Sequence, residues 1–338
     1  GDSISLVGAY NVNAGTVVYR KAITYDSTAQ KIVLIYQDSS NSNYGYGVVG
    51  TVSGTSISFG TPTAFNSGST LDMAITYDAN ANKVVLNYRD SGSGLGVAQV
   101  GTVSGTSISF GSKVSYLTGT VEFPSITYDS TAQKVVLAYR DGTGTNYGRA
   151  IVGTVSGTSI SLGTPVTFEA ASSGGITATY DPVADKTIIS YYDGGNSNYG
   201  TSIQGTVSGT SISFGTPVVF NTATSVWASS TYDSENNLVI VAYQDAGNSS
   251  RGTAVGIVST ELSTNVTSEN YIGIADAAYS DGATAKIQIV GSVDDAQSGL
   301  TAGQSYYVQN DGSLATEPDN PSVIAGTAVS ATKLIVKG

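Results

Sequence analysis

Short alternating segments of apolar and polar residues fill most of this chain, and the same segments return along it. The phrase Thr-Val-Ser-Gly-Thr-Ser-Ile-Ser-Phe-Gly begins at Thr51, Thr102 and Thr206, and a copy with Leu162 in place of Phe begins at Thr154. A Tyr-Asp pair recurs every 51 or 52 residues, ending at Asp26, Asp78, Asp129, Asp181 and Asp233. A fixed period of this length indicates a repeat architecture.

Each repeat predicts four short strands. In the first copy they cover residues 21–25, 32–36, 46–52 and 56–59. The second strand is a continuous run of apolar β-branched residues, which is typical of a strand covered on both faces. The last strand alternates between serine and large apolar residues, which is typical of a strand with one buried face. Gly54 between the last two strands supplies the positive φ of a tight hairpin. No stretch has a sustained helical period.

Repeated four-stranded units of this size predict a β-propeller. Five copies of the first three strands are present, but the fifth copy lacks the fourth strand after Val258. The chain opens with a copy of that strand, Gly1–Leu6. We therefore expect residues 1–263 to form a five-bladed propeller that the N-terminal strand closes, which also covers a sheet edge. The structural alternative is an open β-solenoid.

The repeat stops near Thr264, and residues 264–338 share none of its phrases. Strand-like alternation continues over residues 286–290, 305–308, 322–325 and 333–336. This pattern predicts a second, small all-β domain, a barrel or a sandwich, with a modest core.

Composition excludes several kinds of chemistry. The 338 residues include no Cys and no His, so a thiolate nucleophile, a Ser-His-Asp triad and a zinc site are impossible. The net charge of −11 argues against binding to a nucleic-acid backbone. No apolar run is long enough to span a membrane. The N-terminal residues lack the features of a signal peptide. We expect no cofactor and no metal, although oxygen ligands leave weak Ca²⁺ binding open.

In a propeller, the connections between repeats and the loops after the second strands lie on one face. The connections 66–70, 117–121, 169–173 and 221–225 read as loops that differ from copy to copy. One repeat position, six residues before each Tyr-Asp aspartate, carries a different chemistry in each copy: Arg20, Asp72, Phe123, Gly175 and Trp227. Loops on a rigid scaffold often carry binding sites, so we expect Arg20, Asp72, Phe123 and Trp227 to contact a partner. The alternative is drift in unconstrained loops.

A second candidate site repeats an amide beside an aromatic ring in the loops after the second strands. The pairs are Asn43 with Tyr44, Asn146 with Tyr147, and Asn198 with Tyr199. Sugar recognition often combines an aromatic platform with amide and carboxylate hydrogen bonds, and repeated weak sites would give avidity on a glycan surface. The alternative is that the asparagines shape the loop while the tyrosines pack on a neighbouring repeat.

The repeated aspartates do not predict catalysis. A glycosidase needs two carboxyl groups in different environments, whereas these are nearly equivalent in five copies. An aspartate at the start of a turn accepts hydrogen bonds from local backbone amides, which accounts for them. We expect no enzyme activity.

The C-terminal segments Ser298–Val308, Gly312–Leu314 and Ala325–Leu334 resemble a small β module found at the ends of tailed-bacteriophage virion proteins, including tail fibres. The opening segment Asn270–Ala275 fits the same resemblance. It implies a virion structural protein, a tail fibre or appendage subunit, outside the cell.

We therefore expect the propeller to present a host-surface contact face, while the C-terminal module binds other virion proteins or copies of itself as a homo-oligomer. The first alternative is a multivalent lectin or adhesin of a bacterial surface that binds glycans. The second is a purely architectural, self-assembling subunit.

Overall fold

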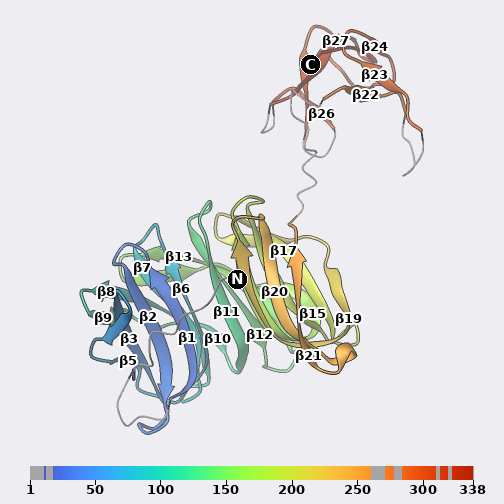
Figure 1. Ribbon diagram of the computed structural model, residues 1–338. Coiled ribbons are helices and arrows are strands. Elements are labelled where there is room, and N and C mark those ends of the chain that lie inside the picture. The colour runs from blue at the N-terminus through green and yellow to red at the C-terminus, as the bar shows by residue number, and fades with distance from the viewer. Residues whose placement is uncertain are drawn as a thin grey trace. The chain divides into compact units, whose positions relative to one another are not determined.

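The computed structural model describes residues 11–12, 18–259, 271–277, 284–309, 313–318 and 322–337 (Figure 1). The chain divides into two compact units, Gly1–Ser259 and Thr260–Gly338. Both consist of antiparallel β-sheets, as the sequence predicts. No helix in the described ranges is long and apolar enough to cross a membrane.

The first unit repeats one antiparallel arrangement five times. The first strands are β1 (Val18–Asp26), β6 (Thr70–Asp78), β11 (Val121–Asp129) and the second halves of β15 (Val166–Asp181) and β19 (Val218–Asp233). The second strands are β2 (Lys31–Asp38), β7 (Lys83–Asp90), β12 (Lys134–Asp141), β16 (Lys186–Asp193) and β20 (Leu238–Asp245). The third strands are β3 (Tyr44–Ser53), β8 (Leu95–Ser104), β13 (Tyr147–Ser156), β17 (Tyr199–Ser208) and β21 (Arg251–Ile257). A 3₁₀ turn, Ala246–Asn248, follows β20.

The fourth strand is interrupted in each of the four repeats where the structure describes one. Its first part pairs with the end of the third strand and is β4 (Ser56–Phe59), β9 (Ser107–Phe110), β14 (Ser159–Leu162) or β18 (Ser211–Phe214). Its second part, β5 (Thr63–Asn66), β10 (Val114–Thr118) or the first half of β15 or β19, pairs with the start of the same third strand.

In three copies the next repeat packs closely on the chain at the interruption. A Cβ atom at Gly60 would lie 1.9 Å from the carbonyl oxygen of Thr106 in the next repeat, so the hairpin of that repeat packs directly on the chain. Pro62 then follows, and proline has no N–H for the ladder. The same approach occurs at Gly111 and Gly163.

Two connections between repeats differ from the prediction. Residues 169–173 and 221–225 were expected to be loops, but they lie inside the continuous strands β15 and β19. The corresponding connections in the earlier repeats contain Gly68 or Gly119, which allow the chain to turn. Glu169–Ser173 and Asn221–Ser225 contain no glycine, and their backbone stays extended.

Successive repeats pack face to face through their second strands. Residues Val84 to Tyr88 of β7 are all buried, which confirms that these apolar runs are covered on both faces. One cluster joins Val85 and Ala98 of the second repeat to Ile126 and Leu137 of the third. Equivalent clusters lie between the first and second, third and fourth, and fourth and fifth repeats.

The first strands of successive repeats also contact one another in the order β1, β6, β11, β15 and β19. Among the described strands, every sheet is an open path and none closes on itself. Ile23 of β1 is 63% exposed, whereas its equivalents Ile75 and Ile126 are 8% exposed, because a preceding repeat covers them. The predicted closing strand, Gly1–Leu6, lies outside the described residues.

The described residues of the second unit form two small sheets. One pairs β22 (Gly273–Ala275) with β23 (Ile287–Ile289). The other has the order β24 (Val293–Asp294), β28 (Lys333–Val336), β27 (Ile324–Ser330), β25 (Ser305–Val308), β26 (Leu314–Ala315). Leu300, Tyr306 and Leu334 form part of its core. The strand expected at residues 322–325 begins two residues later and continues to Ser330, because both of its edges are paired.

Candidate binding site

Every repeat has an irregularity at the same place in its first strand. The pairing register between the first and second strands slips between residues 19 and 21, 71 and 73, 122 and 125, 174 and 177, and 226 and 229. These β-bulges contain the five residues that the sequence singled out by their varied chemistry. We call them the bulge residues: Arg20, Asp72, Phe123, Gly175 and Trp227. Bulges often turn a side chain toward a functional site.

Four of the five bulge residues have a left-handed backbone. The φ angles are 37° at Asp72, 49° at Phe123, 58° at Gly175 and 57° at Trp227. Only glycine adopts this conformation freely, and other residues lose about 1–2 kcal/mol. Phe123 is followed by Pro124, which disfavours a helical-type backbone before it further. Three side chains are therefore held at positions where the backbone alone would favour glycine.

Four of the bulge residues, all except Gly175, gather around one cavity of about 550 Å³. It is lined by residues from the first strands of the first, second, third and fifth repeats, namely Arg20, Lys21, Asp72, Met73, Phe123, Pro124, Trp227, Ala228 and Ser229. The structure thus brings together the four predicted contact residues, which are separated by up to about two hundred residues in the sequence.

A smaller cavity of about 200 Å³ adjoins the first and shares two of its walls, Phe123 and Trp227. Gly175, Tyr192 and Val226 complete its lining. Because Gly175 has no side chain, the fourth repeat leaves this space open instead of filling it. The backbone nitrogen of Trp227 lies 3.4 Å from where a Cβ of residue 175 would stand.

Phe123 is held in place from two sides. The guanidinium of Arg140 lies 4.8 Å from the centre of the Phe123 ring. The Tyr192 ring packs edge to face with the Phe123 ring, with 6.4 Å between the two ring centres. Arg140 donates to Glu122 through two nitrogens, at 2.6 and 2.8 Å, and to the Tyr192 hydroxyl at 3.1 Å. This aromatic wall is therefore rigid. Trp227, in contrast, is 75% exposed and presents its ring to solvent.

The lining of the larger cavity also includes an ion pair. The Nε of Arg20 lies 3.4 Å from Asp72 Oδ1, and both side chains remain partly exposed. Such exposed ion pairs contribute little to stability. The pair supplies N–H donors and carboxylate acceptors side by side, and a ligand with hydroxyl groups can use both.

The three Asn-Tyr pairs are not brought together. Asn43, Asn146 and Asn198 lie in separate loops, one per repeat, and line neither cavity. Each has a left-handed backbone, and each carbonyl accepts a hydrogen bond from the start of the next repeat, at 2.9–3.1 Å. Tyr44, Tyr147 and Tyr199 are partly buried.

The glycine after each Asn-Tyr pair has a packing reason. A Cβ at Gly45, Gly148 or Gly200 would lie 2.4 Å from the ring of Phe65, Phe168 or Phe220. The asparagine and glycine at these loops therefore shape the chain, as the structural alternative for this site expects.

The Tyr-Asp aspartates lie at the other end of the strands, in the turns. Asp78 Oδ1 accepts from the N–H groups of Asn80 and Ala81 at 3.0 and 2.9 Å. Asp26, Asp129, Asp181 and Asp233 accept equivalent bonds, which confirms their role in the turns. In the described part of the chain, no three carboxylates come together as a group that could hold a metal ion.

Sequence reasoning found four of the lining residues of the larger cavity but missed the supporting ones. Arg140 and Tyr192 stand at one repeat position, directly before Asp141 and Asp193, but nothing in that position signals a contact with the Phe123 ring. Glu122 directly precedes Phe123 and gives no such signal either. Gly175 stood at the same repeat position as the four, and its missing side chain is the signal that could have predicted the smaller cavity.

No protein-family model matches this sequence, and no curated protein matches it. Solved structures resemble it only distantly. A leech intramolecular trans-sialidase has a TM-score of 0.46 at 10% identity, covering 72% of this chain and 56% of that one. A protein of unknown function from Dyadobacter fermentans has a TM-score of 0.45 at 9% identity, covering 72% and 94%. The Aleuria aurantia lectin bound to a methyl fucoside has a TM-score of 0.42 at 12% identity, covering 70% and 78%.

This chain thus spans little more than half the length of the leech enzyme. Likenesses at these scores carry no functional assignment for the chain. None of the comparisons identifies a family of phage virion proteins, so the resemblance of the C-terminal segments to such a module stays a prediction.

Proposed function

We propose that the first unit is a non-enzymatic saccharide-binding module, and that its binding site is the cavity at the bulge residues. One observation carries this proposal: Asp72, Phe123 and Trp227 occupy left-handed backbone positions around a single cavity. Strained backbone persists where the surrounding structure holds it, and it clusters at functional sites. A scaffold with no ligand would be more stable with glycine at these positions.

The chemistry of the lining favours a saccharide. Sugar rings have apolar C–H faces and polar hydroxyl edges. Phe123 and Trp227 offer flat apolar surfaces, and the Arg20–Asp72 pair offers donors and acceptors for neighbouring hydroxyls. The cavity volume lies within the range of small-ligand sites, and its few polar groups could fix orientation.

The same lining supports binding without catalysis. Among the described residues of the larger cavity, Asp72 is the single carboxylate, and it is paired with Arg20. Glycoside hydrolysis generally needs two carboxyl groups, one to protonate the leaving group and one to act as nucleophile or base. Glu122 directly precedes the lining residue Phe123, but its carboxylate forms an ion pair with Arg140.

We further propose that the five repeats form a closed five-bladed propeller. The support is that residues of β1 and β19 line the same cavity, so the fifth repeat returns toward the first. The exposed Ile23 of the first repeat and the uncovered Ala242 and Ala254 of the fifth occupy positions that are buried between other repeats. If residues 1–10 complete the fifth blade, deleting them should lower the urea midpoint of unfolding. An unchanged midpoint would show that this segment does not close the ring.

The binding site can be observed directly because Trp227 is the single tryptophan of the chain. A saccharide that stacks on its exposed ring should shift the tryptophan emission to shorter wavelength, and the shift should saturate. The protein would be titrated with a panel of neutral and acidic mono- and disaccharides. We expect Phe123→Ala to weaken the binding of the best saccharide by about 30-fold, the effect of a 2 kcal/mol contact residue.

Trp227→Ala should weaken binding similarly when it is followed by calorimetry. The matched control is Val183→Ala, which removes an exposed apolar side chain from a turn at the other end of the strands. This variant should bind like the unmodified protein. If no saccharide in the panel changes the emission or the calorimetric signal, the proposal is wrong.

The host-surface contact and the place of the chain in a virion remain predictions from the C-terminal resemblance. The binding proposal does not depend on them, because it rests on the first unit. A glycan on a cell surface would fit both the predicted host-surface contact and the proposed saccharide site.

A further inference from the structure

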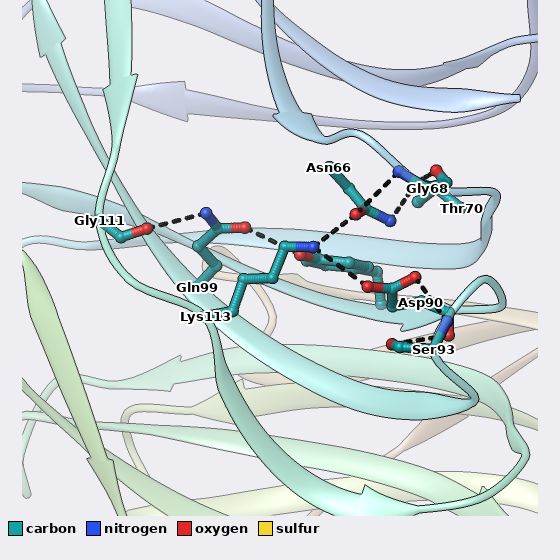
Figure 2. Close-up of polar contacts among 9 residues, drawn as sticks. Asn66, Gly68, Thr70, Asp90, Ser93, Gln99, Gly111 and Lys113 are labelled. Carbon is teal, nitrogen blue, oxygen red and sulfur yellow. Dashed lines mark hydrogen bonds and ion pairs between the residues drawn. The ribbon is translucent and has the colours of Figure 1, made fainter. Parts of the chain in front are cut away.

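A cluster of polar side chains lies where the first repeat connects to the second, and it is centred on Lys113 (Figure 2). Lys113 breaks the repeat: the same position is proline in the other copies, at Pro62, Pro165 and Pro217. This lysine therefore replaces a residue that suits the local backbone, and its side chain crosses to a segment 47 residues earlier.

The ammonium group of Lys113 touches two buried groups at once. Its Nζ contacts the amide oxygen of Asn66 and lies 3.1 Å from Asp90 Oδ2. Asn66 is 2% exposed and Asp90 is 5% exposed. In Figure 2 the three side chains converge on the lysine nitrogen. A buried carboxamide and a buried carboxylate thus contact the amine of a lysine whose side chain is 39% exposed.

The amide of Asn66 is held by two further hydrogen bonds. The backbone N–H of Gly68 donates to Asn66 Oδ1 at 3.2 Å, and Asn66 Nδ2 donates to the Thr70 hydroxyl at 2.8 Å. The Gly68 N–H points at the oxygen that would become negative if a nucleophile added to the amide carbon. The nitrogen that would leave points toward a hydroxyl.

We propose that Lys113 and Asn66 form an intramolecular isopeptide bond. The carboxylate of Asp90 accepts a proton from the Lys113 ammonium, and the neutral amine adds to the side-chain carbonyl carbon of Asn66. The new bond joins Lys113 Nζ to Asn66 Cγ. The bond between Cγ and Nδ2 breaks as Nδ2 takes up the proton from Asp90 and departs as ammonia. The Lys113 nitrogen passes its surplus proton to Asp90, which leaves a neutral amide and a protonated Asp90. No oxidant, metal or further reactant is required.

Asp90 is present as the carboxylate that the proposed proton transfer starts from. Burial raises the pKa of this carboxyl group, but hydrogen bonds from Lys113 and Ser93 outweigh burial and hold the pKa below its ordinary value. The group is therefore ionised beside the lysine before the reaction. The partly exposed lysine side chain leaves a path by which ammonia can reach solvent.

Another junction of the same protein provides a matched comparison. Between the fourth and fifth repeats, Asn221 Nδ2 donates to Asp245 Oδ1 at 3.1 Å and to the Ser225 hydroxyl at 2.9 Å. Asn221, Asp245 and Ser225 occupy the positions of Asn66, Asp90 and Thr70, but in the described part of the chain no lysine forms a hydrogen bond with them. The hydrogen bonds of the asparagine therefore form without a lysine, and Lys113 is an extra residue at the first junction.

The test is the mass of the purified, unfolded full chain. An isopeptide bond lowers this mass by one ammonia relative to the sequence. After trypsin digestion, cleavage at Lys113 should be blocked, and residues 32–83 should be recovered joined to residues 90–134. We expect complete conversion in the folded protein. A mass equal to that of the sequence, even after long incubation, overturns the proposal.

Variants separate this bond from other losses of ammonia. Lys113→Arg should restore the full mass, as should Asp90→Asn, whereas Asn221→Asp should leave the cross-link between Asn66 and Lys113 in place. A cyclic imide at Asn66–Ser67 would also release one ammonia, but trypsin would then still cleave after Lys113. Loss of ammonia with cleavage at Lys113 would therefore also overturn the proposal.

Discussion

The two ends of the repeated first strands differ in how constant their residues are from copy to copy. At the turn end, Asp26, Asp78, Asp129, Asp181 and Asp233 all accept hydrogen bonds from the turn that follows. At the bulge end, the five equivalent positions hold Arg20, Asp72, Phe123, Gly175 and Trp227. The backbone path is nearly the same in all copies, so the difference lies in what the side chains do for it.

At the turn end the side chain satisfies the backbone. The turns also join successive repeats: the Tyr77 hydroxyl donates to Thr28 at 2.7 Å, and the Tyr180 hydroxyl donates to Thr131 at 2.7 Å. Each copy needs the same acceptor for its turn, so each carries the Tyr-Asp pair.

At the bulge end, side chains destabilise the backbone conformation. A left-handed φ favours glycine, and of the four left-handed bulge residues only Gly175 is a glycine. The comparison shows that stabilising residues and cavity-lining residues lie at opposite ends of the same strands. Residues that stabilise the fold recur, and residues that cost stability vary and face a cavity.

The largest expected effect on stability is at the turn end. Asp78→Ala removes the acceptor of two turn N–H groups and should lower the free energy of unfolding by about 2 kcal/mol, the value for hydrogen bonds to a charged group. Urea denaturation would measure this loss. Saccharide affinity should be unchanged, since the bulge residues lie at the opposite end of the strand.

If Asp78→Ala weakened saccharide binding as much as Phe123→Ala, the two ends would not be independent. Asp233→Ala is the graded control, because this aspartate lies in a more exposed turn of the fifth repeat. It should cost less than Asp78→Ala.

A smaller effect of opposite kind is expected at the bulge end. Trp227→Gly and Trp227→Ala both remove the exposed ring, but only glycine relieves the left-handed backbone. The glycine variant should be the more stable of the two by about 1 kcal/mol, because relief of strain exceeds the extra flexibility of glycine in the unfolded chain. Thermal or urea unfolding of both would measure the difference. Equal stabilities would mean that the bulge stores no strain.

The repeated elements could be predicted from the sequence because each follows a local rule. The last strand of the first repeat, residues 56–59, has the predicted bounds, and Gly54 has the positive φ that its hairpin needs. The varied bulge position was also visible, since it stood at a fixed distance from each Tyr-Asp pair.

The conformation at that position could not be predicted. Positive φ is usually signalled by glycine or asparagine, and neither Phe123 nor Trp227 gives such a signal. The convergence of four first strands on one cavity depends on how the repeats pack, which no local pattern contains. The Lys113 cluster was missed because it appears in one copy. Its signal was the lysine that stands where other copies have proline.

The smallest predicted effect concerns Glu169, the one acidic residue at a position that is Asn66, Leu117 or Asn221 in the other repeats. Its carboxylate accepts from the N–H of Ala171 at 2.9 Å and from the Tyr191 hydroxyl at 3.2 Å. Burial raises the pKa of Glu169, and repulsion from Asp193 adds to this, against the hydrogen bonds that lower it.

The sign of the pH effect follows from that shift. Below the ordinary pKa of glutamate, about 4.3, the side chain is protonated whether the chain is folded or not. As the pH rises above this value, the unfolded chain loses the proton first, so the folded state becomes less stable until the pH passes the raised pKa. Glu169→Gln should remove this decline and be more stable at neutral pH by less than about 1 kcal/mol, because the group is partly exposed. Urea midpoints of both proteins across this pH range would measure the effect, and parallel curves would contradict it.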